Sequence, residues 1–106
     1  MGLVVDSTQA LIERLQASRA DRAILTVAAR DVDQGAMDAS LDEAQIARAM
    51  IRNARMVTVL ADTGKFGRHA AYAVCATEDI DLIISDGQLE KAHKAALRDK
   101  GVELWT

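Results

Sequence analysis

The sequence predicts an α/β fold: a three-layer open, mainly parallel sheet with flanking helices. Three apolar runs rich in β-branched residues predict buried strands, at residues 23–29, 56–60 and 81–87. The run 23–29 does not alternate apolar with polar residues, which is typical of a strand buried on both faces. A strongly marked helix separates the first two runs, and this order favours parallel strands joined by a right-handed crossover.

Length and composition limit the chain to one class of protein. We expect residues 1–106 to form a single domain with a modest core. Only 3% of the residues are aromatic, so Ala, Leu, Ile, Val and Met must fill that core. The net charge is −3 and the basic residues are dispersed among acids, which argues against a nucleic-acid-binding module. The sequence shows neither a secretory leader nor a membrane-spanning run, so we expect a cytoplasmic protein without a membrane partner.

The amino-terminal part predicts a helix followed by a strand and an acidic loop. Asp6 or Ser7 can cap a helix that runs to about Ser18. After the predicted strand 23–29, residues 30–39 carry three aspartates and a glycine and are predicted to form a loop. That loop could be a simple turn, a set of metal ligands or an acceptor of sugar hydroxyl groups. A calcium loop is disfavoured because the required terminal glutamate does not follow.

The next segment contains the clearest helix start in the chain. Residues 40–43, Ser-Leu-Asp-Glu, form a capping box, in which the Ser40 hydroxyl accepts from the N3 amide and Glu43 reaches back. Arg48 and Arg52 lie one turn apart on the polar side of this helix, which favours a solvated face over a binding pair. The helix delivers the chain at Arg55 to the predicted strand 56–60.

The loop at residues 61–68 combines an acid, a hydroxyl, two glycines and two cations directly after that strand. Open α/β sheets bind ligands at the carboxyl ends of their strands. Lys65, Arg68 and exposed backbone N–H groups suit an anion such as phosphate. A plain solvated turn is the alternative, and local chemistry alone slightly favours it.

The rest of the chain predicts two more strands and a helix. Residues 69–76 fit either a short helix or a strand, and residues 77–80 predict a turn with a threonine cap. The last helix is expected from about Gln88 to Asp99, with Gly101 as its left-handed cap and a short strand at 102–105. The single cysteine, Cys75, lies in an apolar run and is predicted to be a small buried hydrophobe rather than a nucleophile. His93 is predicted to be a tolerated amphipathic side chain rather than a ligand.

Three segments in fixed order resemble the carboxyl-terminal effector-sensing domain of DeoR-type bacterial transcriptional regulators. They are residues 31–35 before the capped helix, residues 59–68, and residues 79–86. The second and third together carry most of the specificity. The resemblance extends from about residue 20 to the end, and residues 48–51 match the helix that this family usually has ahead of the lysine-bearing strand.

The resemblance implies an effector-sensing and oligomerisation module of a transcriptional repressor. The family's sensor domain resembles ribose 5-phosphate isomerase in fold, and its members typically sense phosphorylated sugars or their derivatives. Lys65 and Asp62 would then border the effector pocket, and Asp31 or Asp33 would face the sugar. Thr63 and Arg68 complete the expected effector site, for which no catalytic residue, metal or cofactor is expected. The family usually has a serine or threonine before the lysine; here that position is Gly64, which Thr63 can partly replace.

The same resemblance predicts that this chain is the second half of such a sensor domain. The family's winged helix-turn-helix and its glycine-rich phosphate loop are not recognised here, so DNA would be reached only through a domain absent from this chain. A half domain has an unpaired sheet edge, which predicts a homo-oligomer. The alternatives are a sugar-phosphate isomerase-like enzyme and a truncated remnant with only a protein-protein role. The enzyme is disfavoured because Ala47-Arg48 stand where the isomerase has a glutamate.

Overall fold

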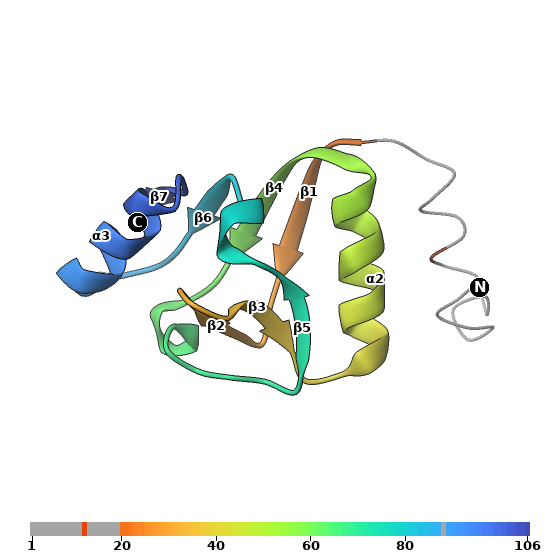
Figure 1. Ribbon diagram of the computed structural model, residues 1–106, viewed down its shortest axis with the longest axis horizontal. Coiled ribbons are helices and arrows are strands. Elements are labelled where there is room, and N and C mark those ends of the chain that lie inside the picture. The colour runs from red at the N-terminus through yellow and green to blue at the C-terminus, as the bar shows by residue number, and fades with distance from the viewer. Residues whose placement is uncertain (1–11, 13–19, 88) are drawn as a thin grey trace.

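The computed structural model describes residues 12, 20–87 and 89–106 of the chain. Apart from Ile12, the predicted helix at residues 7–18 and its caps Asp6 and Ser7 lie outside the described residues. The described fold is α/β, with an open, mainly parallel sheet and flanking helices (Figure 1), which confirms the predicted fold class.

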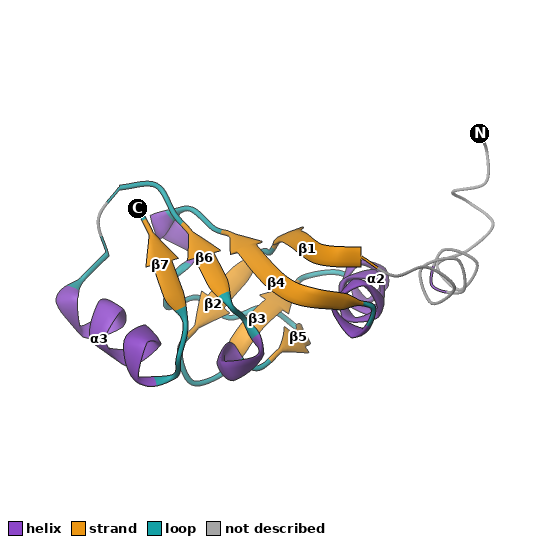
Figure 2. Ribbon diagram, turned by 90° about the horizontal axis from the view of Figure 1, so that it is seen from above, coloured by secondary structure: helices purple, strands orange, loops and turns teal. Residues whose placement is uncertain are grey.

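The main sheet contains four strands in the order β1-β4-β6-β7. They are β1 (Ala20–Thr26), β4 (Ala54–Leu60), β6 (Leu82–Ile84) and β7 (Glu103–Trp105). All three pairings are parallel, so each new strand is added beside the previous one in the same direction. In Figure 2 the four arrows lie side by side in this order. The predicted strand-helix-strand crossover and the predicted final strand are therefore confirmed.

A second, antiparallel sheet was not predicted. It contains β2 (Ala29–Asp31), β3 (Gly35–Asp38) and β5 (Tyr72–Cys75), in the order β2-β3-β5. The prediction of a loop over residues 30–39 is thus wrong for most of that segment, and the undecided segment 69–76 contains a strand. The turn of the β2-β3 hairpin is stabilised by Asp31, whose Oδ1 accepts from the N–H groups of Asp33 (2.8 Å) and Gln34 (3.1 Å).

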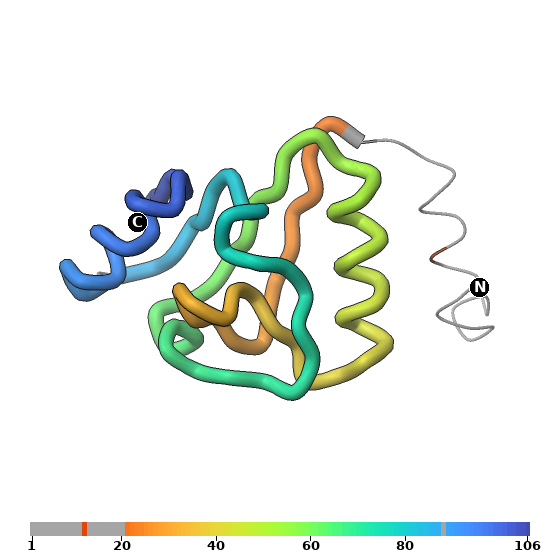
Figure 3. Tube along the Cα trace, viewed as in Figure 1, coloured from red at the N-terminus to blue at the C-terminus, as the bar shows by residue number. Residues whose placement is uncertain are grey.

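Helix α2 (Leu41–Arg52) begins as predicted, because the Ser40 hydroxyl accepts from the Glu43 N–H at 3.4 Å. The helix packs against β1 and β4 of the main sheet and against β3 and β5 of the second sheet (Figure 3). Arg48, on the polar side of the helix, is half-buried, and its guanidinium donates to the carbonyl oxygen of Ala73, with Nε at 2.8 Å. This contact ties α2 to β5.

Helix α3 (Lys91–Asp99) packs against β7 and begins later than predicted. Leu89 is buried in the core, which places the chain just before the helix against the rest of the domain. Gly101 has φ 82° and follows the helix in the left-handed conformation that was predicted. Thr77 does not cap the short turn at Thr77–Asp79. It is buried instead, and its hydroxyl donates to the carbonyl oxygen of Val32 at 2.7 Å.

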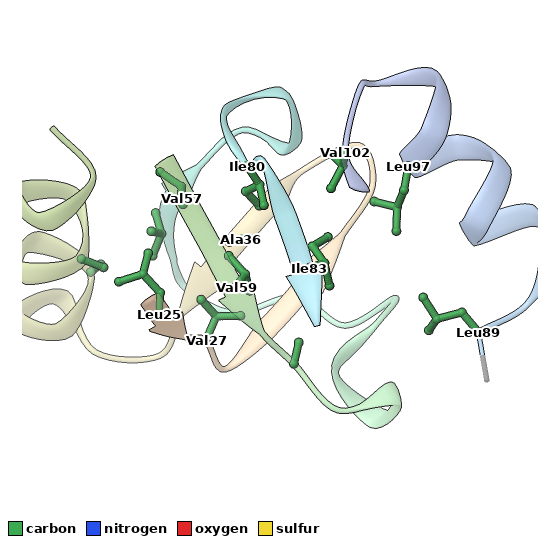
Figure 4. Packing of buried hydrophobic residues seen from close by; sticks show 14 residues of the cluster. Leu25, Val27, Ala36, Val57, Val59, Ile80, Ile83, Leu89, Leu97 and Val102 are labelled. Carbon is green, nitrogen blue, oxygen red and sulfur yellow. The ribbon is translucent and has the colours of Figure 1, made fainter. Parts of the chain in front are cut away.

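The core lies on one face of the main sheet. Leu25, Val57, Val59 and Ile83 point from the strands into this core (Figure 4). The next residue on β1, Ile24, is 56% exposed, so the prediction that this strand is buried on both faces is wrong. An apolar run shows that a strand can be buried, but it does not show which of its faces is covered by another helix or sheet.

Gly35 provides a test of the hairpin. It has φ 85°, and a Cβ atom there would lie 2.0 Å from the carbonyl oxygen of Cys75, whereas at Gly67 (φ 78°) a Cβ would meet nothing within 4 Å. We expect Gly67→Ala to lower the free energy of unfolding by about 1 kcal/mol through backbone strain alone. Gly35→Ala should lower it by about 2 kcal/mol more, because the clash is with backbone. Urea denaturation of both variants measures this, and equal losses would contradict the described packing of β3 against β5.

Candidate functional site

The carboxyl ends of β4 and β6 lie next to each other, because the two strands are neighbours in the main sheet and run parallel. The loops that follow them enclose an open hollow of about 480 Å³. Its lining comes from the last residues of three strands and from the two loops: Thr26, Leu60, Ala61, Asp62, Lys65, Ile84, Ser85 and Asp86. Two acids and one lysine therefore line a hollow at the carboxyl ends of the strands, where α/β proteins bind ligands.

The loop at residues 61–68 is held in place from two sides. The N–H of Thr63 donates to Oδ1 of Asp86 at 2.9 Å, which joins it to the loop after β6. The N–H of Gly67 donates to the carbonyl oxygen of Arg30 at 2.7 Å, which joins it to β2. Between these points a short 3-10 turn spans Thr63–Lys65. The tethers fix the backbone that carries Lys65.

The structure divides the predicted effector residues between two hollows. Asp62 and Lys65 line the hollow of about 480 Å³. Asp31 and Asp33 line a second hollow of about 210 Å³, together with Val32, Phe66, Gly67, His93 and Ala96. Thr63 and Arg68 line neither of these two, although the Thr63 backbone supports the first through Asp86.

The carboxylate of Asp31 is engaged on both oxygens. Oδ1 accepts the two backbone N–H groups of the hairpin turn, and Oδ2 lies 3.2 Å from Nε2 of His69. Burial alone would raise the pKa of Asp31, but the N–H groups of Gln34 and Asp33 and the His69 ring together lower it. Asp31 therefore acts first as a structural anion of the turn. His93, in the same hollow, stacks on Phe66 with ring centroids 6.3 Å apart.

Two carboxylates near the first hollow were missed as site residues. Asp86 lies at the carboxyl end of the predicted strand 81–87, and Asp62 lies just beyond the predicted strand 56–60, so the same rule could have identified Asp86. Asp38 is buried at the end of β3 and accepts from the N–H of Ala28 at 3.2 Å. Burial raises the pKa of Asp38, Glu43 raises it further, and the charge of Lys65 lowers it. Asp38 thus has its carboxyl group within electrostatic reach of Lys65, a feature that the loop prediction for residues 30–39 concealed.

Two further ionisable groups lie inside the domain. The Arg30 side chain is fully buried, and its Nε and Nη1 have no hydrogen-bond partner among the described residues. Burial lowers the pKa of Arg30 to about 10. Cys75 is half-buried rather than buried as predicted. Desolvation raises the pKa of its thiol to about 11, so the thiol is neutral at pH 7, which disfavours a nucleophile. Among the described residues, no group of three His, Cys, Asp or Glu side chains could hold a metal ion, and no helix is long and apolar enough to cross a membrane.

Comparison with known proteins gives consistent matches over most of the chain. The family model of the DeoR C-terminal sensor domain matches residues 4–87. The chain is 31% identical over 100 residues to the HTH-type transcriptional regulator GlpR of Haloferax volcanii, covering 94% of this chain and 38% of that protein. It is 33% identical over 92 residues to a putative aga operon transcriptional repressor of Escherichia coli, covering 87% and 34%. It is 32% identical over 94 residues to the HTH-type transcriptional repressor GlcR of Bacillus subtilis, covering 89% and 36%.

These matches test two predictions, the family resemblance and the class of protein. The predicted resemblance is confirmed, and the three relatives are named as transcriptional regulators or repressors, in agreement with the prediction that this chain is not an enzyme. The chain spans little more than a third of the length of each of them.

The contact between Thr63 and Asp86 predicts a local change in stability. Asp86→Ala removes the acceptor of the Thr63 N–H, whereas Asp86→Asn keeps an oxygen in its place. We expect the Thr63 amide to exchange with solvent about fivefold faster in the alanine variant, which corresponds to roughly 1 kcal/mol of hydrogen bonding. Hydrogen exchange followed by NMR measures this. Equal exchange in wild type and the alanine variant would show that this contact does not hold the loop.

The half-buried thiol of Cys75 predicts slow alkylation. Raising the pKa of Cys75 from 9.0 to about 11 lowers its thiolate fraction at pH 8 by about 100-fold. Iodoacetamide should therefore label the folded chain about 100 times more slowly than the same chain in urea. The rate for the folded chain should rise with pH until the pH reaches the pKa. A folded chain that reacts as fast as the unfolded chain would contradict the raised pKa of the Cys75 thiol.

Proposed function

Because the chain belongs to the DeoR family of transcriptional regulators through their C-terminal sensor domain, we propose that it binds a phosphorylated sugar or sugar derivative as an effector. The binding site is the hollow at the carboxyl ends of β4 and β6. The observation that carries this proposal is the placement of Lys65 among the acids of that hollow, on a loop tethered from two sides.

The chemistry of the lining fits a ligand with one anionic end and one hydroxylated end. Lys65 supplies a cation for a phosphate group. The exposed N–H groups expected in this loop are not available at Thr63, Lys65 and Gly67, because these N–H groups donate to oxygens inside the domain. The carboxylates of Asp62 and Asp86 can accept hydrogen bonds from sugar hydroxyl groups. A hollow of about 480 Å³ is in the size range of small-molecule sites. Apolar side chains of Leu60 and Ile84 form the rest of its wall.

The remaining predicted site residues have supporting places in this proposal. Asp31 and Asp33 line the second hollow, where a ligand that extends past Phe66 would meet them. Thr63 positions the loop through its backbone, and its hydroxyl stands next to Gly64, where the family usually has a hydroxyl of its own. Arg68 is exposed at the end of the loop and lines neither hollow.

The regulatory mechanism that follows is a population shift. An effector that binds one quaternary arrangement more tightly than another changes their ratio. In a regulator of this kind, the arrangement of the sensor domains would set the spacing of DNA-binding domains carried elsewhere on the polypeptide. The chain would thus act as an effector-sensing and oligomerisation module, and it would meet DNA only through another domain.

A lysine comparison tests the proposal. Isothermal titration calorimetry with ribose 5-phosphate, glucose 6-phosphate and glycerol 3-phosphate would identify a ligand. Lys65→Ala should then weaken its binding about tenfold to hundredfold, which is the range for losing a charge-assisted hydrogen bond. Lys91→Ala, an exposed lysine on α3, should leave binding unchanged.

Two results would overturn the proposal. Equal binding by wild type and Lys65→Ala would show that the hollow is not the effector site. A wild-type chain that binds none of the three sugar phosphates would leave the described domain with a protein-protein role only.

A further inference from the structure

A further hollow lies between helix α3 and the last strand of the main sheet. Its volume is about 350 Å³, and we call it the α3-β7 hollow. Its lining comes from α3 and from the chain around β7: Lys94, Arg98, Val102, Glu103, Leu104 and Thr106. It shares no lining residue with the hollows of about 480 and 210 Å³. Figures 1 and 2 both show α3 beside β7, at the end of the sheet away from β1. The α3-β7 hollow is therefore separate from the proposed effector site.

Two cations form one wall of the α3-β7 hollow. Lys94 and Arg98 stand one turn apart on α3, so their side chains lie on the same side of the helix. Within the described ranges 20–87 and 89–106, neither side chain forms an ion pair. Glu103 also belongs to the lining, but its carboxylate accepts a hydrogen bond from Nε1 of Trp105 on the same strand. The two positive charges therefore favour an anionic group in this hollow.

Apolar side chains form the other wall of the α3-β7 hollow. Val102 is buried, and Leu104 is half-buried and packs against the core cluster. Residues at alternate positions of a strand point to the same face, so Leu104 points to the core face, whereas Glu103 and Trp105 point to the opposite face. A ligand of this hollow therefore meets cations from α3 and an apolar surface from the chain around β7.

The free edge of β7 borders the same hollow. Strand β7 is last in the order β1-β4-β6-β7, so it pairs along one edge only. On that paired edge the N–H of Glu103 donates to the carbonyl oxygen of Asp81 at 3.0 Å, and the carbonyl oxygen of Trp105 accepts from the N–H of Ser85 at 2.9 Å. Alternate residues of a parallel strand bond to the same neighbour, so the N–H and C=O of Leu104 point away from β6. Leu104 therefore offers a backbone donor and a backbone acceptor to an added strand.

We propose that the α3-β7 hollow binds an acidic segment of a partner protein in extended conformation. The segment adds to the free edge of β7 through the N–H and C=O of Leu104, which is a common way for peptides to bind an exposed sheet edge. One acidic side chain of the segment pairs with Lys94 and Arg98, and one apolar side chain packs on Val102 and Leu104. Both side chains face α3, so they are two residues apart in the segment. The free strand edge beside the cations favours a peptide over a small anion.

Peptide binding tests the charge requirement. The probe is a fluorescein-labelled peptide with the repeat glutamate-serine-valine-serine, and fluorescence anisotropy measures its binding to the full chain. Lys94→Glu and Arg98→Glu should each weaken binding at least about tenfold, because they place like charges opposite the peptide. Lys91→Glu, on the same helix but outside the lining, is the matched control and should change binding little. Circular dichroism establishes that the variants are folded. A wild-type chain that does not bind the peptide, or an equal loss in Lys91→Glu, would overturn the proposal.

Hydrogen exchange tests the strand pairing. The N–H of Leu104 should exchange with solvent at least about fivefold more slowly when the chain is saturated with the peptide, because the peptide backbone then accepts its hydrogen bond. NMR resolves this amide from those of Glu103 and Trp105, which lie on the paired edge and should change less. Peptide binding that leaves the exchange of the Leu104 amide unchanged would show that only the charges attract the peptide, and it would overturn the pairing with β7.

The effector hollow provides the last control. Lys65 lines the hollow of about 480 Å³ and not the α3-β7 hollow, so Lys65→Ala should bind the acidic peptide as the wild type does. Loss of peptide binding in Lys65→Ala would place the peptide in the effector hollow and overturn this proposal. Unchanged peptide binding in a chain that binds no sugar phosphate would support this proposal and reject only the proposed effector function.

Discussion

The parallel pairing of β4 with β1 and β6 is the constraint on which the candidate site depends. The β2-β3 hairpin and helix α2 return the chain from the end of β1 to the start of β4, so both strands run in the same direction and end on the same side of the sheet. The loops after β4 and β6 consequently meet, and the Thr63 N–H can reach Asp86. With antiparallel pairing, these two loops would lie at opposite ends of the sheet and could not form one hollow.

The second sheet supports that site from below the loop. Its hairpin turns tightly at Asp31 and Gly35, and β2 offers the Arg30 carbonyl oxygen to the Gly67 N–H. It also packs with α2 over the core face of the main sheet, in a chain with very few aromatic side chains. The position of β2 within the domain buries the Arg30 guanidinium, and the lowered pKa of Arg30 reflects the cost of removing this charge from water. One residue of β2, Arg30, thus holds the loop through its backbone and carries the buried cation on its side chain.

The first strand of the main sheet differs between its two faces. Residues at alternate positions point to opposite faces, so Leu25 enters the core while Ile24 remains exposed. The last residue of this strand, Thr26, is exposed and lines the same hollow as Lys65.

The sequence by itself determined the α/β class, the cap of α2 at Ser40, the parallel crossover and the family, because local hydrogen bonding, apolar runs and short motifs are written in neighbouring residues. It also indicated that Asp62 and Lys65 follow a strand. Only the tertiary structure decided that residues 30–39 pair as a hairpin, that Asp31 and Asp33 line a different hollow from Lys65, and which face of each strand is covered. Those features depend on contacts between residues far apart in the chain, and an apolar or acidic segment does not specify its partner.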